Sequence, residues 1–163
     1  MKLFLLTVVL LLTGVTDWKR MIIPDGFVLA VALLGVWCWL TEPGPGLFER
    51  LAGAAAVSVP MAGVERIWPG SFGYGDIKLC AAAGLLLGLP RLLVAFFLAV
   101  LSGGGYAFWL LCRDRNNRKR QIAFGPFLAG GIWVSQVFGS CMLEWYLDGW
   151  KGGWFHAAVL LPG

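Results

Sequence analysis

Charged side chains are scarce in this chain of 163 residues, because Asp, Glu, Lys and Arg together make up only 13% of it. That is about half the share found in ordinary globular proteins. Apolar residues make up 59%. A soluble protein of this length has too small an interior to bury so much apolar surface. The composition therefore argues against a soluble domain and predicts an integral membrane protein.

Residue types that bind metals are also few. The chain has one histidine, His156, and none of its four cysteines forms a CxxC pair: Cys38, Cys80, Cys112 and Cys141. A zinc site would lack its ligand framework, so we expect no metal, no other cofactor, and thiols buried among apolar side chains. The net charge is +4, but the basic residues lie between apolar runs. There they set membrane topology, and nucleic-acid binding is not expected.

Six apolar segments are separated by short polar or Pro- and Gly-rich breaks, at residues 1–16, 26–40, 51–64, 77–89, 92–112 and 122–143. A backbone in lipid must satisfy its own hydrogen bonds, which favours helices. The sequence therefore predicts an all-α integral membrane protein of about six transmembrane helices. Residues 1–143 would form the polytopic domain, and residues 144–163 an interfacial or disordered tail.

The basic residues indicate the orientation of these helices. With the amino terminus outside, nine would lie on the inner side: Lys19, Arg20, Arg66, Lys78, Arg113, Arg115, Arg118, Lys119 and Arg120. Four would lie on the outer side: Lys2, Arg50, Arg91 and Lys151. Since positively charged loops stay in the cytoplasm, both termini are expected outside. A cleaved signal peptide is the alternative for the first segment, but no Ala-x-Ala site follows it.

Two aspartates, Asp17 and Asp76, border apolar segments and would both face the cytoplasm. An aspartate at the centre of a membrane helix costs roughly 3 kcal/mol, so such an acid indicates a functional site. Two acids that meet on one side of the membrane suggest an aspartic-protease dyad. The first and fourth segments are short for a span of about 20 residues, which predicts a water-accessible notch beside them.

The segment Gly73-Tyr74-Gly75-Asp76 predicts a close backbone approach followed by the start of a helix. A purely structural role for Asp76, as an N-cap, stays open at this point. Lys78 lies two residues further on, and positions i and i+2 do not share a helix face, so a salt bridge to Asp76 is not expected. Membrane-interface anchoring and support of an active site remain its two interpretations.

Three motifs in this order resemble those of the bacterial type IV prepilin peptidases. Asp17 precedes Pro24 by seven residues, residues 72–79 resemble the GxGDxK motif, and residues 122–129 are similar to a late FGPFLA segment. The resemblance implies a GxGD-type membrane aspartyl protease that removes the basic leader of type IV prepilins or pseudopilins at the cytoplasmic face of the inner membrane. By motif position, Asp17 and Asp76 would be catalytic, and Gly73, Gly75 and Lys78 would support them.

Many members of that family carry an amino-terminal module with paired CxxC motifs, which is linked to methylation of the new amino terminus. This chain resembles the short form without that module, so N-methyltransferase activity is not expected. Two alternatives remain for the paired acids. One is a small membrane transporter or proton relay, which would need polar groups near the middle of several spans. The other is a presenilin-like GxGD protease.

Overall fold

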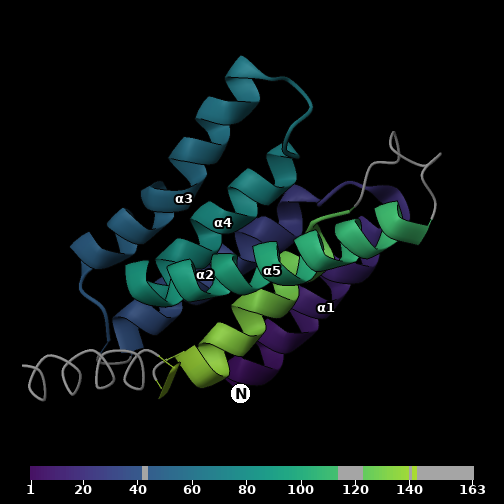
Figure 1. Cartoon of the computed structure of the whole chain (residues 1–163). Coiled ribbons are helices and arrows are strands. Elements are labelled where there is room, and N and C mark those ends of the chain that lie inside the picture. The colour runs from purple at the N-terminus through teal and green to yellow at the C-terminus, as the bar shows by residue number, and fades with distance from the viewer. Residues whose placement is uncertain (42–43, 114–122, 140, 143–163) are drawn as a thin grey trace, which may run out of the picture.

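The computed structural model describes residues 1–41, 44–113, 123–139 and 141–142, and all regular structure within these ranges is helical (Figure 1). The helices are α1 (Lys2–Arg20), α2 (Asp25–Thr41), α3 (Leu47–Ile67), α4 (Tyr74–Leu87) and α5 (Leu89–Arg113). A further helix covers residues 125–139 and is called here the 125–139 helix. The prediction of an all-α chain is confirmed for this part of the protein, whereas the predicted tail at 144–163 lies outside it.

Most helices extend further than the apolar segments that predict them. The first runs to Arg20 instead of residue 16, and Met21 ends it in the left-handed conformation with φ 52°. The apolar pattern underestimates its length because charged residues in a final turn interrupt the pattern without interrupting the helix. Asp17 therefore lies inside α1, one turn before its end, and not in the loop that follows.

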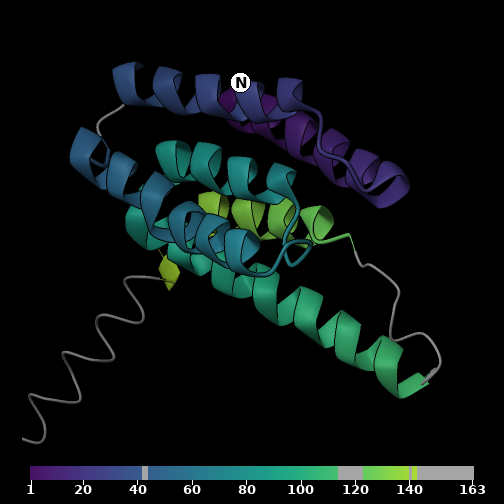
Figure 2. The ribbon, with the colours of Figure 1, turned by 90° about the horizontal axis from the view of Figure 1, so that it is seen from above.

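The short helix α4 lies at the centre of the structure. Figure 2 shows α4 between the pair α1 and α2 on one side and the pair α3 and α5 on the other. Its most extensive packing is against α3 and α2, and nine of its 14 residues are buried. A helix that is apolar on all sides and packed on several faces is a core helix. The element that carries Asp76 is thereby held from several directions.

Glycines allow α3 and α4 to approach closely. A Cβ atom at Gly84 of α4 would collide with the backbone of Ala54 in α3, and one at Gly53 would lie 2.8 Å from the backbone of Gly88 and Leu89. Such contacts between small residues are typical of packed membrane helices. Gly84 and Gly53 thus set how closely α3 and α4 pack.

Arg50, one of the basic residues assigned above to the outer side, is buried and not a free surface charge. It lies in α3, is only 4% exposed, and donates to the carbonyl oxygens of Leu85 at 2.6 Å and Leu86 at 3.0 Å, near the end of α4. Its Nε also donates to the carbonyl of Pro45 at 3.0 Å. A cation at a helix carboxyl terminus satisfies free carbonyls and complements the helix dipole. Arg50 therefore has a structural role that its position in the sequence did not indicate.

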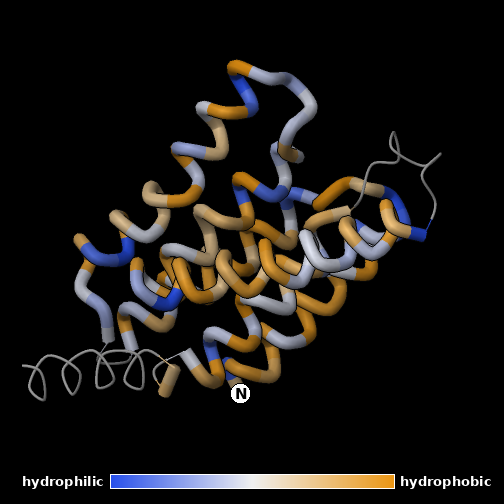
Figure 3. The backbone as a smooth tube through the Cα atoms, viewed as in Figure 1, coloured by the Kyte–Doolittle hydropathy of each residue, from blue (hydrophilic) through white to orange (hydrophobic). Residues whose placement is uncertain are grey.

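The outer surface of the helices is apolar. Large side chains more than 60% exposed occur on α1, α2, α3 and α5, among them Phe4, Leu40, Phe48, Phe97 and Phe108. Hydrophilic residues gather toward helix ends and connections (Figure 3). By length and composition α3 and α5 could each cross a membrane, and α2 is a shorter apolar helix. So much exposed apolar surface suits contact with lipid and not with water. The expectation of buried thiols is wrong for Cys112 and Cys141, which are exposed on this surface.

Candidate active site

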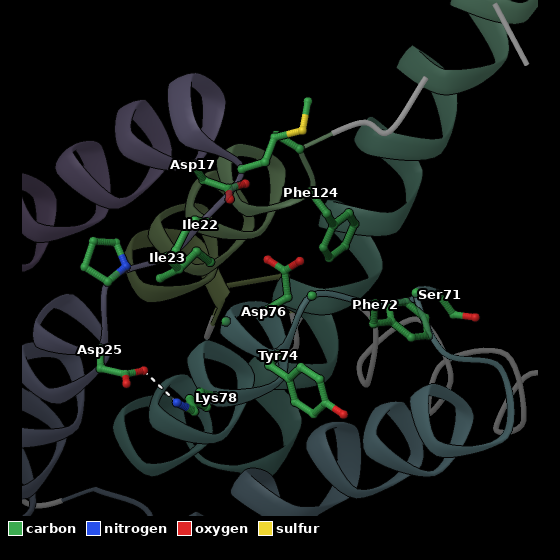
Figure 4. A pocket seen from close by; sticks show the side chains of 16 residues that line it. Asp17, Ile22, Ile23, Asp25, Ser71, Phe72, Tyr74, Asp76, Lys78 and Phe124 are labelled. Carbon is green, nitrogen blue, oxygen red and sulfur yellow. Dashed lines mark hydrogen bonds and ion pairs between the residues drawn. The ribbon is translucent and has the colours of Figure 1, made fainter. Parts of the chain in front are cut away.

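Three segments far apart in the sequence surround one cavity of about 680 Å³ (Figure 4). They are the end of α1 with the turn that follows it, the connection from α3 into the first turn of α4, and the two residues that precede the 125–139 helix. Its lining includes residues 21–25, residues 70–76, and the side chains of Asp17, Lys78, Ala123 and Phe124. The two aspartates singled out by the sequence thus line the same cavity.

Asp17 is 5% exposed, and its Oδ2 atom accepts a hydrogen bond from the backbone N–H of Gly125 at 2.9 Å. The N–H groups of the first turn of a helix have no partner within that helix. The carboxylate of Asp17 supplies such a partner, at the end of the helix where the dipole favours negative charge. Asp17 is therefore fixed by an element 108 residues further along the chain.

Only glycine fits at position 125 without moving this carboxyl group. A Cβ atom there would lie 2.5 Å from Oδ2 of Asp17 and 2.8 Å from its Cγ. In the sequence, Gly125 stands out only as part of the segment 122–129, without a role of its own. The close approach of backbone to carboxylate now provides one.

Asp76 is the third residue of α4 and is 8% exposed. The N-cap position of α4 is taken by Gly73, whose carbonyl accepts the N–H groups of Asp76 at 3.0 Å and Ile77 at 3.2 Å. The N-cap interpretation of Asp76 is therefore wrong. Its Oδ1 atom is buried and has no hydrogen-bond partner within the described residues. In Figure 4 the carboxyl groups of Asp17 and Asp76 both point into the cavity.

The two glycines of the Gly73-Tyr74-Gly75-Asp76 segment make different close contacts. A Cβ atom at Gly75 would lie 2.8 Å from Cβ of Ile23, in the turn between α1 and α2, and one at Gly73 would lie 3.2 Å from Oδ2 of Asp76. Gly75 thus lets the start of α4 pack against the segment that follows Asp17. The predicted close backbone approach is confirmed at this position.

Lys78 forms an ion pair with Asp25, the first residue of α2, at 2.7 Å. Both side chains are largely exposed, at 53% and 76%. The pair joins the starts of α2 and α4 at the rim of the cavity, and the partner of Lys78 is Asp25 and not Asp76. Within the described residues no group of three His, Cys, Asp or Glu side chains could hold a metal ion, and His156 lies outside them.

One further acid near the cavity, Glu65, lies outside the motifs that the sequence points to. Glu65 lies in the last part of α3, is 6% exposed, and accepts hydrogen bonds from two backbone N–H groups of the connection between α3 and α4. Nothing in the sequence pattern indicates these bonds, because they depend on how the connection folds back on its own helix.

Comparison with known proteins gives consistent matches. A profile of the type IV leader peptidase family matches residues 4–108, a range that includes Asp17 and Asp76. The prepilin leader peptidase/N-methyltransferase of Bacillus subtilis is 30% identical over 138 residues, which cover 85% of this chain and 56% of that protein. Proteins with the same name from Aeromonas salmonicida and from Pectobacterium carotovorum are 31% identical over 159 residues and 33% identical over 152 residues.

These two alignments cover 88% and 86% of this chain, and 51% and 50% of the Aeromonas and Pectobacterium proteins respectively. The chain thus spans about half the length of the relatives that it matches. No solved structure is significantly similar to it.

Proposed function

Because the chain belongs to the type IV leader peptidase family, we propose that it is an aspartic endopeptidase that removes the basic leader of type IV prepilins or pseudopilins. The observation that carries the proposal is the pair of buried carboxyl groups, from Asp17 and Asp76, that line one cavity although their helices are separated in the sequence. The proposal covers peptide-bond cleavage only, and no N-methyltransferase activity is assigned to this chain.

The chemistry follows from two carboxyl groups that share one proton, since like charges close together do not both ionise readily. The ionised carboxylate takes a proton from a water molecule, whose oxygen attacks the scissile carbonyl carbon. The protonated carboxyl group gives its proton to the carbonyl oxygen. Collapse of the tetrahedral intermediate breaks the C–N bond. The leaving amine takes the proton that the first carboxyl group had removed from water, and the second carboxylate recovers a proton from a hydroxyl group of the intermediate. The pair acts as a unit, so neither Asp17 nor Asp76 is assigned as the base.

Gly73, Gly75 and Lys78 would support the pair in different ways. The two glycines allow the backbone to pass close to Asp76 and to Ile23. Lys78 holds the start of α2 against the start of α4 through Asp25. None of the three would take part in proton transfer.

Removing either carboxyl group tests the assignment. A positioned acid or base contributes about 10²–10⁴-fold to a rate, so Asp17→Asn and Asp76→Asn should each reduce cleavage at least about 100-fold. Glu49→Gln is the matched control, because Glu49 lies in the first turn of α3 and is not among the residues that line the cavity. The variants are co-expressed with a candidate prepilin, and the amino terminus of the product is sequenced. Cleavage at the wild-type rate by either aspartate variant refutes the dyad.

We also propose that the protein lies in the bacterial inner membrane and that its cavity opens toward the cytoplasm. The basic residues in the last turns of α1, α3 and α5 support this orientation: Lys19, Arg20, Arg66 and Arg113. Two single-cysteine variants test it, in a background without native cysteines. Ser71→Cys, at the cavity, should react with a membrane-impermeant thiol reagent only in inverted vesicles. Leu47→Cys, at the opposite end of α3, should react only in intact cells with a permeable outer membrane. The reverse pattern refutes the orientation.

A further inference from the structure

We propose that Glu65 is a positioning residue that fixes the connection between α3 and α4 as a substrate-binding wall of the cavity. The proposal rests on the peptidase function proposed above and adds to it a residue outside the two acids and their motifs. Both oxygen atoms of the buried Glu65 carboxylate accept hydrogen bonds from the backbone. Oε1 accepts the backbone N–H of Gly70 and Oε2 that of Phe72, each at 2.8 Å.

In a helix or a strand, backbone carbonyl groups would accept these two N–H groups. In this irregular connection the Glu65 carboxylate accepts them instead. Helix α3 ends at Ile67, and the chain then turns through Gly70, which has a positive φ of 90°. The N–H of Ser71 bonds to the carbonyl of Trp68 at 3.2 Å within the same turn. Hydrogen bonds to an ionised acceptor are roughly twice as strong as neutral ones. The Glu65 carboxylate is thus a strong tie between the turn and its own helix.

The tied segment is a wall of the cavity and leads directly to Asp76. Four consecutive residues of it, 70–73, line the cavity, whereas Glu65 itself does not. The carbonyl of Gly73, the residue after the tied Phe72, accepts the N–H of Asp76. A shift of the connection would therefore move the surface that an extended peptide contacts, whereas α4 is held in place by its packing against α2 and α3. Because Glu65 does not face the reacting atoms, its effect would pass through this connection.

The consequence is a change in substrate binding more than in proton transfer. Glu65→Gln keeps one carbonyl oxygen but places an amide NH₂ group against a second N–H donor, so one tie is lost. Glu65→Ala loses both. We expect KM for a purified prepilin to rise about tenfold in Glu65→Gln and further in Glu65→Ala, while kcat changes less than about threefold. The tenfold step corresponds to one lost hydrogen bond to a charged group.

Glu49→Gln serves as the control, because it also removes one acid from α3, at the end away from the cavity. A fraction of misfolded protein would lower the apparent kcat and leave KM unchanged. The direction of change therefore separates a positioning role from a loss of stability. Suppose that the wild type cleaves prepilin and that cleavage depends on Asp17 and Asp76. An unchanged KM in Glu65→Gln and Glu65→Ala then overturns the role of Glu65 and leaves the proposed function intact.

Hydrogen exchange of the detergent-solubilised protein gives a second readout that does not depend on activity. The backbone amides of Gly70 and Phe72 should exchange at least about tenfold faster in Glu65→Gln than in the wild type or in Glu49→Gln, with helix α4 unchanged. If the wild type cleaves no prepilin, the proposed function fails, and the exchange result decides the role of Glu65. Equal amide exchange rates in all three proteins would show that Glu65 does not hold the connection. Faster exchange in Glu65→Gln, confined to the connection, would support its role.

Discussion

Replacing Gly125 with alanine would place a methyl group 2.5 Å from Oδ2 and 2.8 Å from Cγ of Asp17. Carbon atoms do not approach other heavy atoms that closely, so one of the two groups has to retreat. The backbone at position 125 begins a helix that is packed along its length, whereas the carboxyl group can rotate. Asp17 is therefore expected to turn away from position 125 by roughly 1 Å, and its bond to the N–H of Gly125 would be lost.

The size of the effect follows from this displacement. A hydrogen bond to a charged group is worth about 1.5–3 kcal/mol, or roughly 10- to 150-fold in an equilibrium or a rate. A misplacement of about 1 Å in a catalytic group can cost about 100-fold. We expect kcat/KM for prepilin cleavage to fall about 100-fold in Gly125→Ala. The helix itself should form at least as well, because alanine is the better helix former by about 1 kcal/mol.

Gly130→Ala is the matched control, since it makes the same change in the same helix and a Cβ atom there would meet nothing within 4 Å. Both variants are purified in detergent and compared in kcat/KM and in the amount of inserted protein. Cleavage by Gly125→Ala within threefold of the wild type, at equal amounts of protein, would show that Asp17 does not need the position seen in the structure, and would refute this site.

Two other substitutions have smaller or different expected effects. Lys78→Gln removes the ion pair with Asp25, but both partners are more than half exposed, so stability should change by less than about 1 kcal/mol and cleavage by less than about fivefold. A 100-fold loss would mean that Lys78 acts on the substrate directly. Arg50→Met leaves buried carbonyl groups near the end of α4 without their donor, which should lower the free energy of unfolding by about 2–4 kcal/mol. An unchanged thermal midpoint in detergent would contradict that structural role.

The order of the helices could be predicted because lipid and local chemistry leave few alternatives. Apolar runs mark the helices, proline and glycine interrupt the chain between several of them, and Pro90 stands near the start of α5, where its missing N–H costs nothing. The close approach of Gly75 to a neighbouring segment was also predictable, since glycine has no Cβ atom and lets another segment pack against the backbone. These features depend on residues close together in the sequence.

The contacts that position the site could not be predicted in the same way. Asp17 meets Gly125 across 108 residues, and Lys78 meets Asp25 across 53. An apolar helix with no strongly polar face carries little information about its rotation around its own axis, so the sequence does not say which residue of one helix faces which residue of another. Arg50 shows the same limit, since a lone cation beside an apolar run fits a topology charge as well as a buried cap.

The surroundings of Asp76 lead to a prediction about stability that separates catalysis from folding. Its Oδ1 atom is buried and accepts no hydrogen bond from the described residues, so the fold itself does little to offset the cost of burying this polar group. A residue kept only for folding would not carry that cost, whereas catalytic groups often do, at the expense of stability. Asp76→Ala should therefore abolish prepilin cleavage and leave the thermal midpoint in detergent equal to or above that of the wild type. A midpoint several degrees lower would refute this expectation, because it would show that the carboxyl group stabilises the start of α4.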